Sequence, residues 1–325
     1  MADRNNHRVL IFNGLPTGNT ATADAVLGQT SLTAGLINAG GGATISAQGF
    51  NEPCGVAVRN SGEVLVVDRA NNRVVIFASV PTSLGTWNAY RVIGQPNMAS
   101  GTANNFSVAN GGKLNDPSAV HVIDGKIYIA DRNNHRILVF NSLPTSDGAS
   151  ADLIIGQPDA STVNVGTDYA TSSSYLNHPY EVHKSGNQFF VADGDNNRVL
   201  IYNAVPSVAD TRPNMVLGQA GSTGGFANRS GPVAANTLYL PVSVAVVSGK
   251  LAIADQNNHR LLFYDFPLSN GQAASYVLGQ SNFLGSSFGT TASKYKYPKS
   301  FVIDNGYIWV ADIDNNRIQV MQLPF

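Results

Sequence analysis

The sequence is poor in charge and in cysteine. Only 13% of its 325 residues are charged, and the net charge is −1, whereas an ordinary globular domain carries about 25% charged residues. A balanced charge offers no basic surface to nucleic acid or to an anionic membrane, so we expect neither as a partner. The single cysteine, Cys54, permits no internal disulfide.

Long apolar runs and the motifs of common enzymes are also missing. No stretch approaches the roughly 18 apolar residues of a membrane span, and the first residues, MADRNNHR, do not form a signal peptide. No Ser-His-Asp order, P-loop or zinc-finger spacing occurs. The low charge and the many Asn, Thr and Gly residues resemble secreted or periplasmic bacterial proteins, which is the compartment that composition favours.

What the sequence has instead is a repeat. The residues ADRNNHRVLIFN at 2–13 return at 130–141 as ADRNNHRILVFN. Asp, followed by Asn three residues later and Arg five residues later, occurs six times, at intervals of 65, 63, 62, 62 and 57 residues. A catalytic loop is needed once, whereas a building block is needed many times. We therefore interpret these Asp and Arg residues as structural: Asp3, Arg8, Asp68, Arg73, Asp131, Arg136, Asp193, Arg198, Asp255, Arg260, Asp312 and Arg317.

Each repeat contains four short runs rich in β-branched and aromatic residues and bounded by turn residues. A Pro-led run such as PSAVHV, which we call strand A, is followed by a Gly turn and by strand B, which ends in the Asp, as in KIYIAD. Strand C follows the Arg, and strand D ends in a recurring Gly-Gln, as in VLGQ. Four antiparallel strands repeated in series are typical of β-propeller blades, so the sequence predicts an all-β propeller.

The repeated turn has a chemical rationale. We expect the Asp to accept amide protons of the turn and the Arg to hold that carboxylate in two places through its planar fork. His7, His135 and His259 stand where other copies have Asn. Both residue types tolerate the left-handed backbone of a tight turn, so we assign these histidines no catalysis.

These features resemble the NHL-repeat family of β-propellers. The Pro-led strand, the VAD ending of strand B, the NNRV segment and the following apolar strand carry the resemblance over essentially the whole chain. The VLGQP ending resembles the long-repeat bacterial branch of that family. The resemblance implies a propeller, usually of six blades. Similar propellers include protein-binding and RNA-binding modules and an amidating lyase domain, and related folds include lactonases and esterases, so the fold does not choose a function.

The strand pattern leaves the number of blades open. It contains five A, five B, six C and five D strands. Five blades close if residues 4–13 and 315–322 compete for one C position. Six blades require an A and a B strand before residue 1 and a D strand after residue 325. We predict a single propeller domain over 1–325 whose seam is imperfect or truncated.

The connections from strand D to the next strand A are long for a compact domain. They share one face with the Asp-Asn-Arg turns, and long loops on a rigid scaffold are where binding residues concentrate. We therefore predict a non-enzymatic scaffold that binds a protein, peptide or carbohydrate on this long-loop face. The five connections run roughly over 30–52, 97–116, 159–178, 221–240 and 281–297, and their aromatic residues are Phe50, Phe106, Tyr169, Tyr175, Phe226, Tyr239, Phe283 and Phe288.

Strand A supplies the alternative hypothesis. Counted from their leading prolines, His121 and His183 occupy equivalent places on neighbouring blades, and Glu181 lies on the same side of its strand as His183. Asp116 and His178 stand just before the two prolines. Imidazole and carboxylate groups can ligate a divalent metal ion or serve acid–base chemistry, although solvated channel lining would use the same residue types.

The alternative function is thus a metal-dependent propeller enzyme, a lyase or lactonase by resemblance, with its site in the central channel. Its metal ligands would be His121, His183, Glu181 and Asp116, and its catalytic residues would be His121, His178, Glu181 and His183. A divalent metal ion is the one cofactor that the sequence suggests. Separately, KYKYPKSF at 294–301 interleaves Lys with Tyr, which suits contact with phosphate, but a solvated rim is the favoured interpretation.

Overall fold

A computed structural model of the chain describes residues 1–16, 18, 21–40, 42, 44–166, 176–209, 211–221, 223–323 and 325. The chain divides into two compact units. Unit 1 comprises Met1–Ile154 and Asp159–Val163, and unit 2 comprises Ile155–Pro158 and Asn164–Phe325. The described residues form β-strands and short 3-10 turns, with no α-helix among them. The predicted all-β propeller fold is confirmed.

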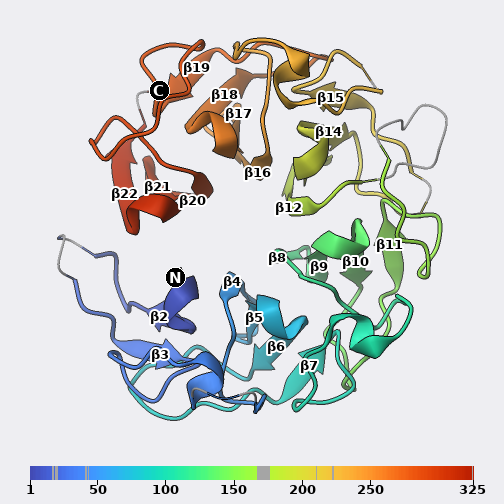
Figure 1. Ribbon diagram of the computed structural model, residues 1–325, viewed down its shortest axis with the longest axis vertical. Coiled ribbons are helices and arrows are strands. Elements are labelled where there is room, and N and C mark those ends of the chain that lie inside the picture. Colours follow the sequence, from blue (N-terminus) through green and yellow to red (C-terminus); the bar gives the residue numbers. More distant parts are fainter. Residues whose placement is uncertain are drawn as a thin grey trace. The chain divides into compact units, whose positions relative to one another are not determined.

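Unit 1 contains three antiparallel sheets, which we number as blades in chain order (Figure 1). Blade 1 has three strands, and blades 2 and 3 have four each. Blade 1 consists of β1 (Ala2–Asp3), β2 (Arg8–Ile11) and β3 (Ala25–Leu27). Blade 2 consists of β4 (Pro53–Val58), β5 (Val64–Asp68), β6 (Arg73–Phe77) and β7 (Arg91–Ile93). Blade 3 consists of β8 (Ala119–Ile123), β9 (Lys126–Asp131), β10 (Arg136–Phe140) and β11 (Leu153–Ile155), whose last residue belongs to unit 2.

Unit 2 contains the other three sheets. Blades 4 and 5 have four strands, and blade 6 has three. Blade 4 consists of β12 (Pro179–Ser185), β13 (Gln188–Asp193), β14 (Arg198–Tyr202) and β15 (Met215–Leu217); blade 5 of β16 (Pro241–Val247), β17 (Lys250–Asp255), β18 (Arg260–Asp265) and β19 (Tyr276–Leu278); blade 6 of β20 (Pro298–Asp304), β21 (Tyr307–Asp312) and β22 (Arg317–Gln322).

The 3-10 turns fall into two groups. Six of those described lie at the repeated motif, between strands B and C, and three lie in the long D–A connections. The first group is η1 (Arg4–Asn6), η3 (Arg69–Asn71), η5 (Arg132–Asn134), η6 (Gly194–Asn196), η8 (Gln256–Asn258) and η9 (Ile313–Asn315), and the second is η2 (Ile37–Ala39), η4 (Ala103–Phe106) and η7 (Ala227–Ser230).

The sheet pairing gives six blades, one of the two numbers that the sequence left open, and excludes five. β2 pairs with β3, with Val9 opposite Leu27, whereas β22 pairs with β21, with Arg317 opposite Asp312. Residues 4–13 and 315–322 therefore belong to different sheets and do not compete for one position. Blade 1 also has a B strand that was not expected, the two-residue β1, which pairs with β2.

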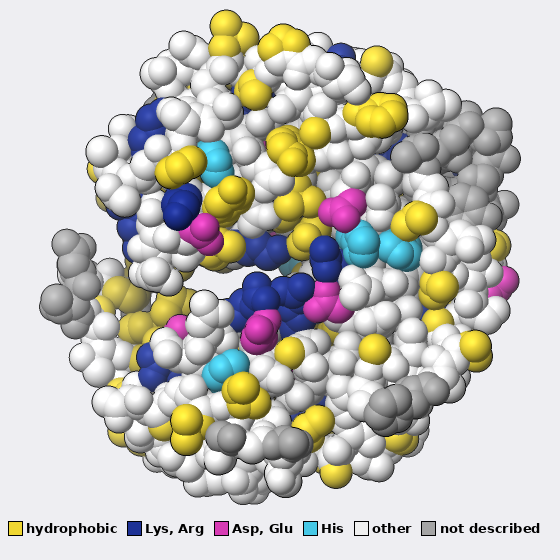
Figure 2. All heavy atoms as spheres, in the orientation of Figure 1, with side chains coloured by type: hydrophobic (Ala, Val, Ile, Leu, Met, Phe, Trp, Pro, Cys, Tyr) yellow, Lys and Arg dark blue, Asp and Glu magenta, His cyan; other side chains and the backbone are white. Residues whose placement is uncertain are grey.

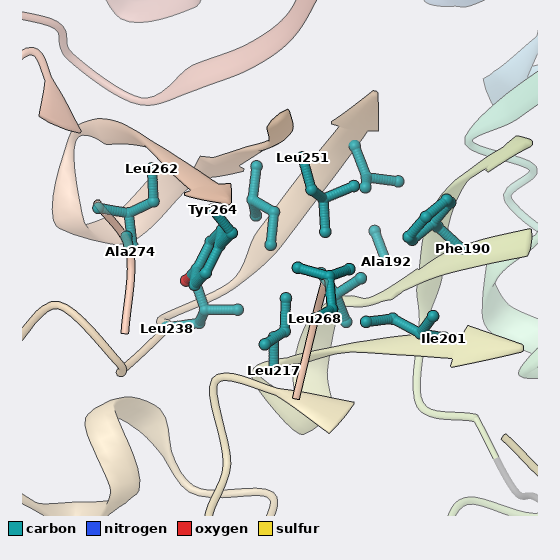
Figure 3. Close-up of a cluster of buried hydrophobic side chains, with 13 residues drawn as sticks. Phe190, Ala192, Ile201, Leu217, Leu238, Leu251, Leu262, Tyr264, Leu268 and Ala274 are labelled. Carbon is teal, nitrogen blue, oxygen red and sulfur yellow. The ribbon is translucent and has the colours of Figure 1, made fainter. Parts of the chain in front are cut away.

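Within each unit, neighbouring blades pack against each other through apolar side chains, which cover both faces of the middle sheet, blade 2 in unit 1 and blade 5 in unit 2. Strands such as β6 and β10 are buried along their whole length, which explains why they read as continuous apolar runs rather than as alternating patterns. Figure 3 shows one such core, in which Phe190 and Leu217 from blade 4 meet Leu251 and Tyr264 from blade 5. Full burial of one such side chain contributes about 1.5–3 kcal/mol relative to exposure.

The outer strands D are short, and in two blades the next blade covers their edge. In unit 1, the Val92 amide of β7 donates to Asp147 Oδ1, and the Gly148 amide donates to the Val92 carbonyl. In unit 2, Asn270 and Gly271 make the same pair of bonds to Val216 of β15. Unpaired strand edges promote aggregation, so these turns satisfy an edge as well as connecting strands C and D.

Candidate functional site

The repeated Asp anchors the start of its blade rather than capping its turn. In blade 3, Asp131 Oδ1 accepts the amide of Asn115, 16 residues earlier, at 2.8 Å. Its Oδ2 accepts Asn134 Nδ2 and Arg136 Nε, each at 2.8 Å, and its side chain makes no cap hydrogen bond to η5. The predicted amide contact within the turn is therefore wrong. The predicted two-point contact with Arg is also wrong, because only Nε of the guanidinium binds the carboxylate and the other nitrogens bind elsewhere.

The remaining nitrogens of the guanidinium bind backbone carbonyls of two successive long loops. Arg136 Nη1 donates to the Ala160 carbonyl in the connection after blade 3, and Nη2 donates to Asn110 and Lys113 in the connection before it. Both members of the Asp131–Arg136 pair have no exposed side-chain surface. The Asp and Arg residues are therefore structural, as predicted, and they fix the positions of the loops.

The interchange of His and Asn has a specific cause. The residue after the Asn of the motif is left-handed, with φ between 50 and 54° in all six copies. In the copies at His7, Asn72, Asn197 and His259, its side chain accepts the amide proton of the residue before the next leading proline. His7 Nδ1 does so from Glu52 at 3.1 Å, and Asn72 Oδ1 does so from Asp116 at 2.8 Å. Either residue type supplies this acceptor, so the histidines have a structural role.

The recurring Gly-Gln at the end of strand D fixes the start of each long loop. A Cβ on Gly94, where φ is +91°, would lie 2.5 Å from the buried side chain of Leu114. Gln95 Nε2 donates to the carbonyl of Asn72 and to that of Thr102, seven residues after the Gln, both at 2.9 Å. The same seven-residue clamp occurs at Gln29, Gln157, Gln219 and Gln280. The recurrence was visible in the sequence, but its role was not.

Directly after this clamp, three loops of unit 2 project a large apolar side chain. Val165, Phe226 and Phe288 stand seven or eight residues after their glutamines and are 57%, 70% and 61% exposed. In unit 1, Leu36 is placed in the same way and is also exposed. Of the predicted loop aromatics, Phe50 is instead buried, and Tyr169 and Tyr175 lie outside the described residues.

At the rim of unit 1, the predicted ligand Asp116 is an ion-pair partner. It accepts hydrogen bonds from Arg69 Nε and from Arg132 Nη1, each at 2.6 Å. Glu52, which stands at the equivalent position before the leading proline of blade 2, pairs with Arg4. Burial alone would raise the pKa of Asp116, but the two guanidinium groups hold it below its usual value. The other predicted residue of this unit, His121, lies on β8 opposite Tyr128.

The remaining predicted residues lie in unit 2. His178 Nδ1 is 2.6 Å from Asp195 Oδ2. On β12, burial raises the pKa of Glu181 to about 8, while the Ser243 hydroxyl and the Lys299 ammonium act in the opposite direction. Burial lowers the pKa of His183, whose Nε2 accepts the Val246 amide at 3.1 Å.

Within the part of the chain that the structure describes, no three His, Cys, Asp or Glu side chains are grouped as a metal ion would require. The metal site built from His121, His183, Glu181 and Asp116 therefore stays a prediction. The same residues include no helix long and apolar enough to cross a membrane.

The two units differ at the rim on the side of the repeated turns. In unit 1, basic and acidic side chains lie together where β4 and β8 begin (Figure 2). The position before the leading proline is Glu52 or Asp116 in unit 1 but Leu240 or Tyr297 in blades 5 and 6. This position is therefore acidic in blades 2 and 3 and apolar or aromatic in blades 5 and 6, while blade 4 has His178.

Serial four-stranded sheets with one repeated turn define a β-propeller built from blade-sized repeats. The family model described as the NHL repeat matches residues 50–77 and 114–140, which span blades 2 and 3 up to strand C. The same turn, with its Asp–Arg pair, occurs in six copies along the chain. The protein is therefore a β-propeller whose blades 2 and 3 match the NHL repeat.

Several solved structures are similar in fold. A protein of unknown function from Bacteroides caccae is 11% identical, with 84% of this chain and 77% of that chain covered and a TM-score of 0.45. A protein provisionally assigned as a 6-phosphogluconolactonase, from Bacteroides uniformis, is 13% identical, with 86% and 83% covered and a TM-score of 0.47. A nidogen/laminin complex is 14% identical, with 84% and 76% covered and a TM-score of 0.44. No curated protein matches the chain in sequence.

Proposed function

We propose that the protein is a non-enzymatic scaffold that binds a protein or peptide through its long D–A loops. The observation that carries the proposal is the exposure of a large apolar side chain directly after the Gln clamp in successive loops of unit 2. Exposed apolar groups that recur at one position of a repeat mark an interaction surface more strongly than scattered ones do.

The way in which these loops are held supports binding. The loop that carries Phe226 is fixed at both ends, because Gln219 Nε2 donates to the Phe226 carbonyl at 2.9 Å and Arg260 Nη2 donates to the Thr237 carbonyl at 2.9 Å. A loop that is already ordered loses less conformational entropy when a partner binds. Phe226 and Phe288 can therefore act as anchors for apolar side chains of a partner.

The test is a selection of displayed peptides on the intact protein, followed by affinity measurements. We expect peptides selected on the wild type to bind the double variant Phe226→Ser/Phe288→Ser at least about tenfold more weakly, because each anchor of this kind is worth more than about 1.4 kcal/mol. Val208→Ser is the matched control, since Val208 is 61% exposed but lies in a C–D turn.

Equal affinity for the wild type and the double variant would contradict the proposal, as would equal losses in the double variant and in Val208→Ser. Circular dichroism and thermal unfolding of all three proteins establish that the variants keep the fold. Failure of the selection to yield any binding peptide would also count against it.

A further inference from the structure

Blade 6 is a sheet with an open edge. Its strands β20, β21 and β22 correspond to strands A, B and C, and no described strand pairs with the outer edge of β22 (Figure 1). In blades 1, 2, 4 and 5, a strand D pairs there, with the three residues that follow the Arg of the motif. The equivalent residues of β22 are Ile318, Gln319 and Val320. An edge strand presents backbone groups that can pair with a further strand.

The hydrogen bonds of blade 2 show which backbone groups of strand C face strand D. The amide and carbonyl of Val92 on β7 point away from strand C, because they bond to the turn of the next blade. Backbone groups of successive residues in a strand point in opposite directions, so those of Arg91 and Ile93 point toward strand C. The residues opposite these two on β6 are Ile76 and Val74, whose backbone groups therefore face strand D.

On β22, the positions of Val74 and Ile76 are taken by Ile318 and Val320, so the backbone groups of these two residues face the open edge. Ile318 and Val320 are 40% and 45% exposed, whereas Val74 and Ile76 are not exposed at all. In blade 2, the latter pair shares an apolar cluster with Ile93 of strand D and with side chains of blade 3. The edge of β22 thus offers both main-chain hydrogen bonds and uncovered apolar side chains.

The repeat also shows how a strand in this place would end. In blades 1, 2, 4 and 5, the Gln after strand D donates to the backbone carbonyl of the left-handed residue of the motif, at 2.9 or 3.0 Å. The equivalent residue of blade 6 is Asn316, which is left-handed as well. The Gly before each Gln has a φ between 85 and 93°, which favours glycine. A strand that ends in Gly-Gln is therefore complementary to the Asn316 carbonyl.

We propose that the outer edge of β22 binds an extended segment of a partner polypeptide by addition of a β-strand. The segment has the chemistry of this protein's own strands D: Val, then Leu or Ile opposite Ile318, then Gly-Gln. In this mode of recognition, main-chain hydrogen bonds supply affinity, and the side chains supply specificity. The site lies on blade 6 and does not use Phe226 or Phe288, so the inference is independent of the proposed binding at the long loops.

The test is fluorescence anisotropy of a labelled peptide with the sequence of residues 89–97, AYRVIGQPN, titrated with the intact protein. We expect a Kd below about 0.5 mM. Replacing Ile93 of the peptide by Pro removes a main-chain donor that points toward β22 and should weaken binding at least about tenfold. Replacing Gln95 of the peptide by Ala removes the donor to Asn316 and should weaken binding about three- to tenfold.

A matched pair of variants locates the peptide on the protein. Val320→Asp should weaken binding at least about fivefold, because a charged side chain at an edge opposes pairing with another strand. Val302→Asp is the control, since Val302 is exposed on the same face of blade 6 but lies on β20, away from the open edge, and it should change the affinity less than about twofold. Circular dichroism and thermal unfolding show that both variants are folded.

Four results would overturn the proposal: no binding at about 0.5 mM protein, equal affinity for the peptide and its Pro version, equal losses in the two Asp variants, or a dimer in analytical ultracentrifugation that Val320→Asp dissociates. The last result would assign the edge to a second copy of the chain. The double variant Phe226→Ser/Phe288→Ser should bind this peptide as the wild type does. A loss of binding there would place the peptide on the long loops instead, so failure of this proposal and failure of the proposed function are distinguishable.

Discussion

The same Asp–Arg pair is fully buried in blade 3 and partly exposed in the two three-stranded blades. Arg136 has no exposed side-chain surface, whereas Arg8 of blade 1 is 15% exposed and Arg317 of blade 6 is 29% exposed. The distance from Nε to the carboxylate is nevertheless nearly the same, 2.7 or 2.8 Å. The pair itself is therefore unchanged, and its surroundings make the difference.

The carbonyl acceptors of the guanidinium explain the contrast. Arg136 binds both the loop before its blade and the loop after it. Arg8 binds only the loop that follows, at Leu32 and Ala34. Arg317 binds only the loop that precedes, at Thr290, Thr291 and Lys294. The guanidinium is thus completely buried where it binds carbonyls of two loops and partly exposed where it binds carbonyls of one loop.

The largest effect is expected for Arg136→Ala. Removing this guanidinium leaves Asp131 buried without its counter-charge and leaves three loop carbonyls without donors, so we expect a loss of about 3–5 kcal/mol in the free energy of unfolding. Urea denaturation measures it. Arg59→Ala is the control, because Arg59 pairs with Glu63 at a partly exposed position and should cost less than about 1 kcal/mol. Similar values for the two variants would refute the structural role of the pair.

The next effect concerns the Gln clamp at the end of strand D. Blades 1 to 5 have this clamp, whereas blade 6 has three strands and no strand D. Gln95→Ala removes both donors that hold the Asn72 and Thr102 carbonyls in a fully buried site. We expect a loss of about 1–3 kcal/mol and faster amide hydrogen exchange over residues 97–116 than elsewhere. Unchanged exchange in that loop would show that the clamp does not order it.

A smaller effect is expected for Arg317→Ala, which tests the comparison directly. Asp312 keeps the Lys296 amide and Asn315 Nδ2 as donors, and Arg317 is partly exposed. We therefore expect a loss of about 1–2 kcal/mol, less than half of that for Arg136→Ala, in the same urea experiment. If the two variants lose equal stability, the second loop contributes nothing and our account of the contrast fails.

The smallest effect extends the comparison to the charged rim of unit 1. The folded-state pKa of Asp116 lies below its ordinary value of 3.8, so its ion pairs add stability above that value and lose it as the pH falls through the folded-state pKa. Asp116→Asn should be less stable by up to about 1 kcal/mol at pH 7, and the difference should shrink as the pH falls below the ordinary pKa of the group and through its folded-state pKa. Thermal unfolding over this range measures the difference, and one that did not depend on pH would contradict the ionic explanation.

The fold could be predicted because its information is local and repeated. Strand order, the Gly turn between strands A and B and the structural role of Asp and Arg follow from runs of residues that recur five or six times. The blade count could not be predicted, since the two candidate strands around Arg8 and Arg317 have the same sequence pattern, and only pairing with β3 or β21 separates them.

The site could be predicted only in part. Sequence comparison between copies singles out Glu181 and His183 because they replace small residues. It does not show that Lys299 on β20 reaches Tyr180 on β12, or that Asp116 is held between two arginines. Such contacts depend on long side chains crossing between strands, which periodicity does not record.

The turns that cover the edges of β7 and β15 have a consequence for assembly. Because Asp147 and Asn270 each cap the strand D of the preceding blade, the protective group for one repeat is encoded in the next repeat. Duplication of a whole repeat would therefore add a capping residue together with each new strand edge. Insertion or deletion of part of a repeat would separate a strand edge from the residue that caps it. Selection for solubility in such a protein acts on the phase of the repeat as well as on its composition.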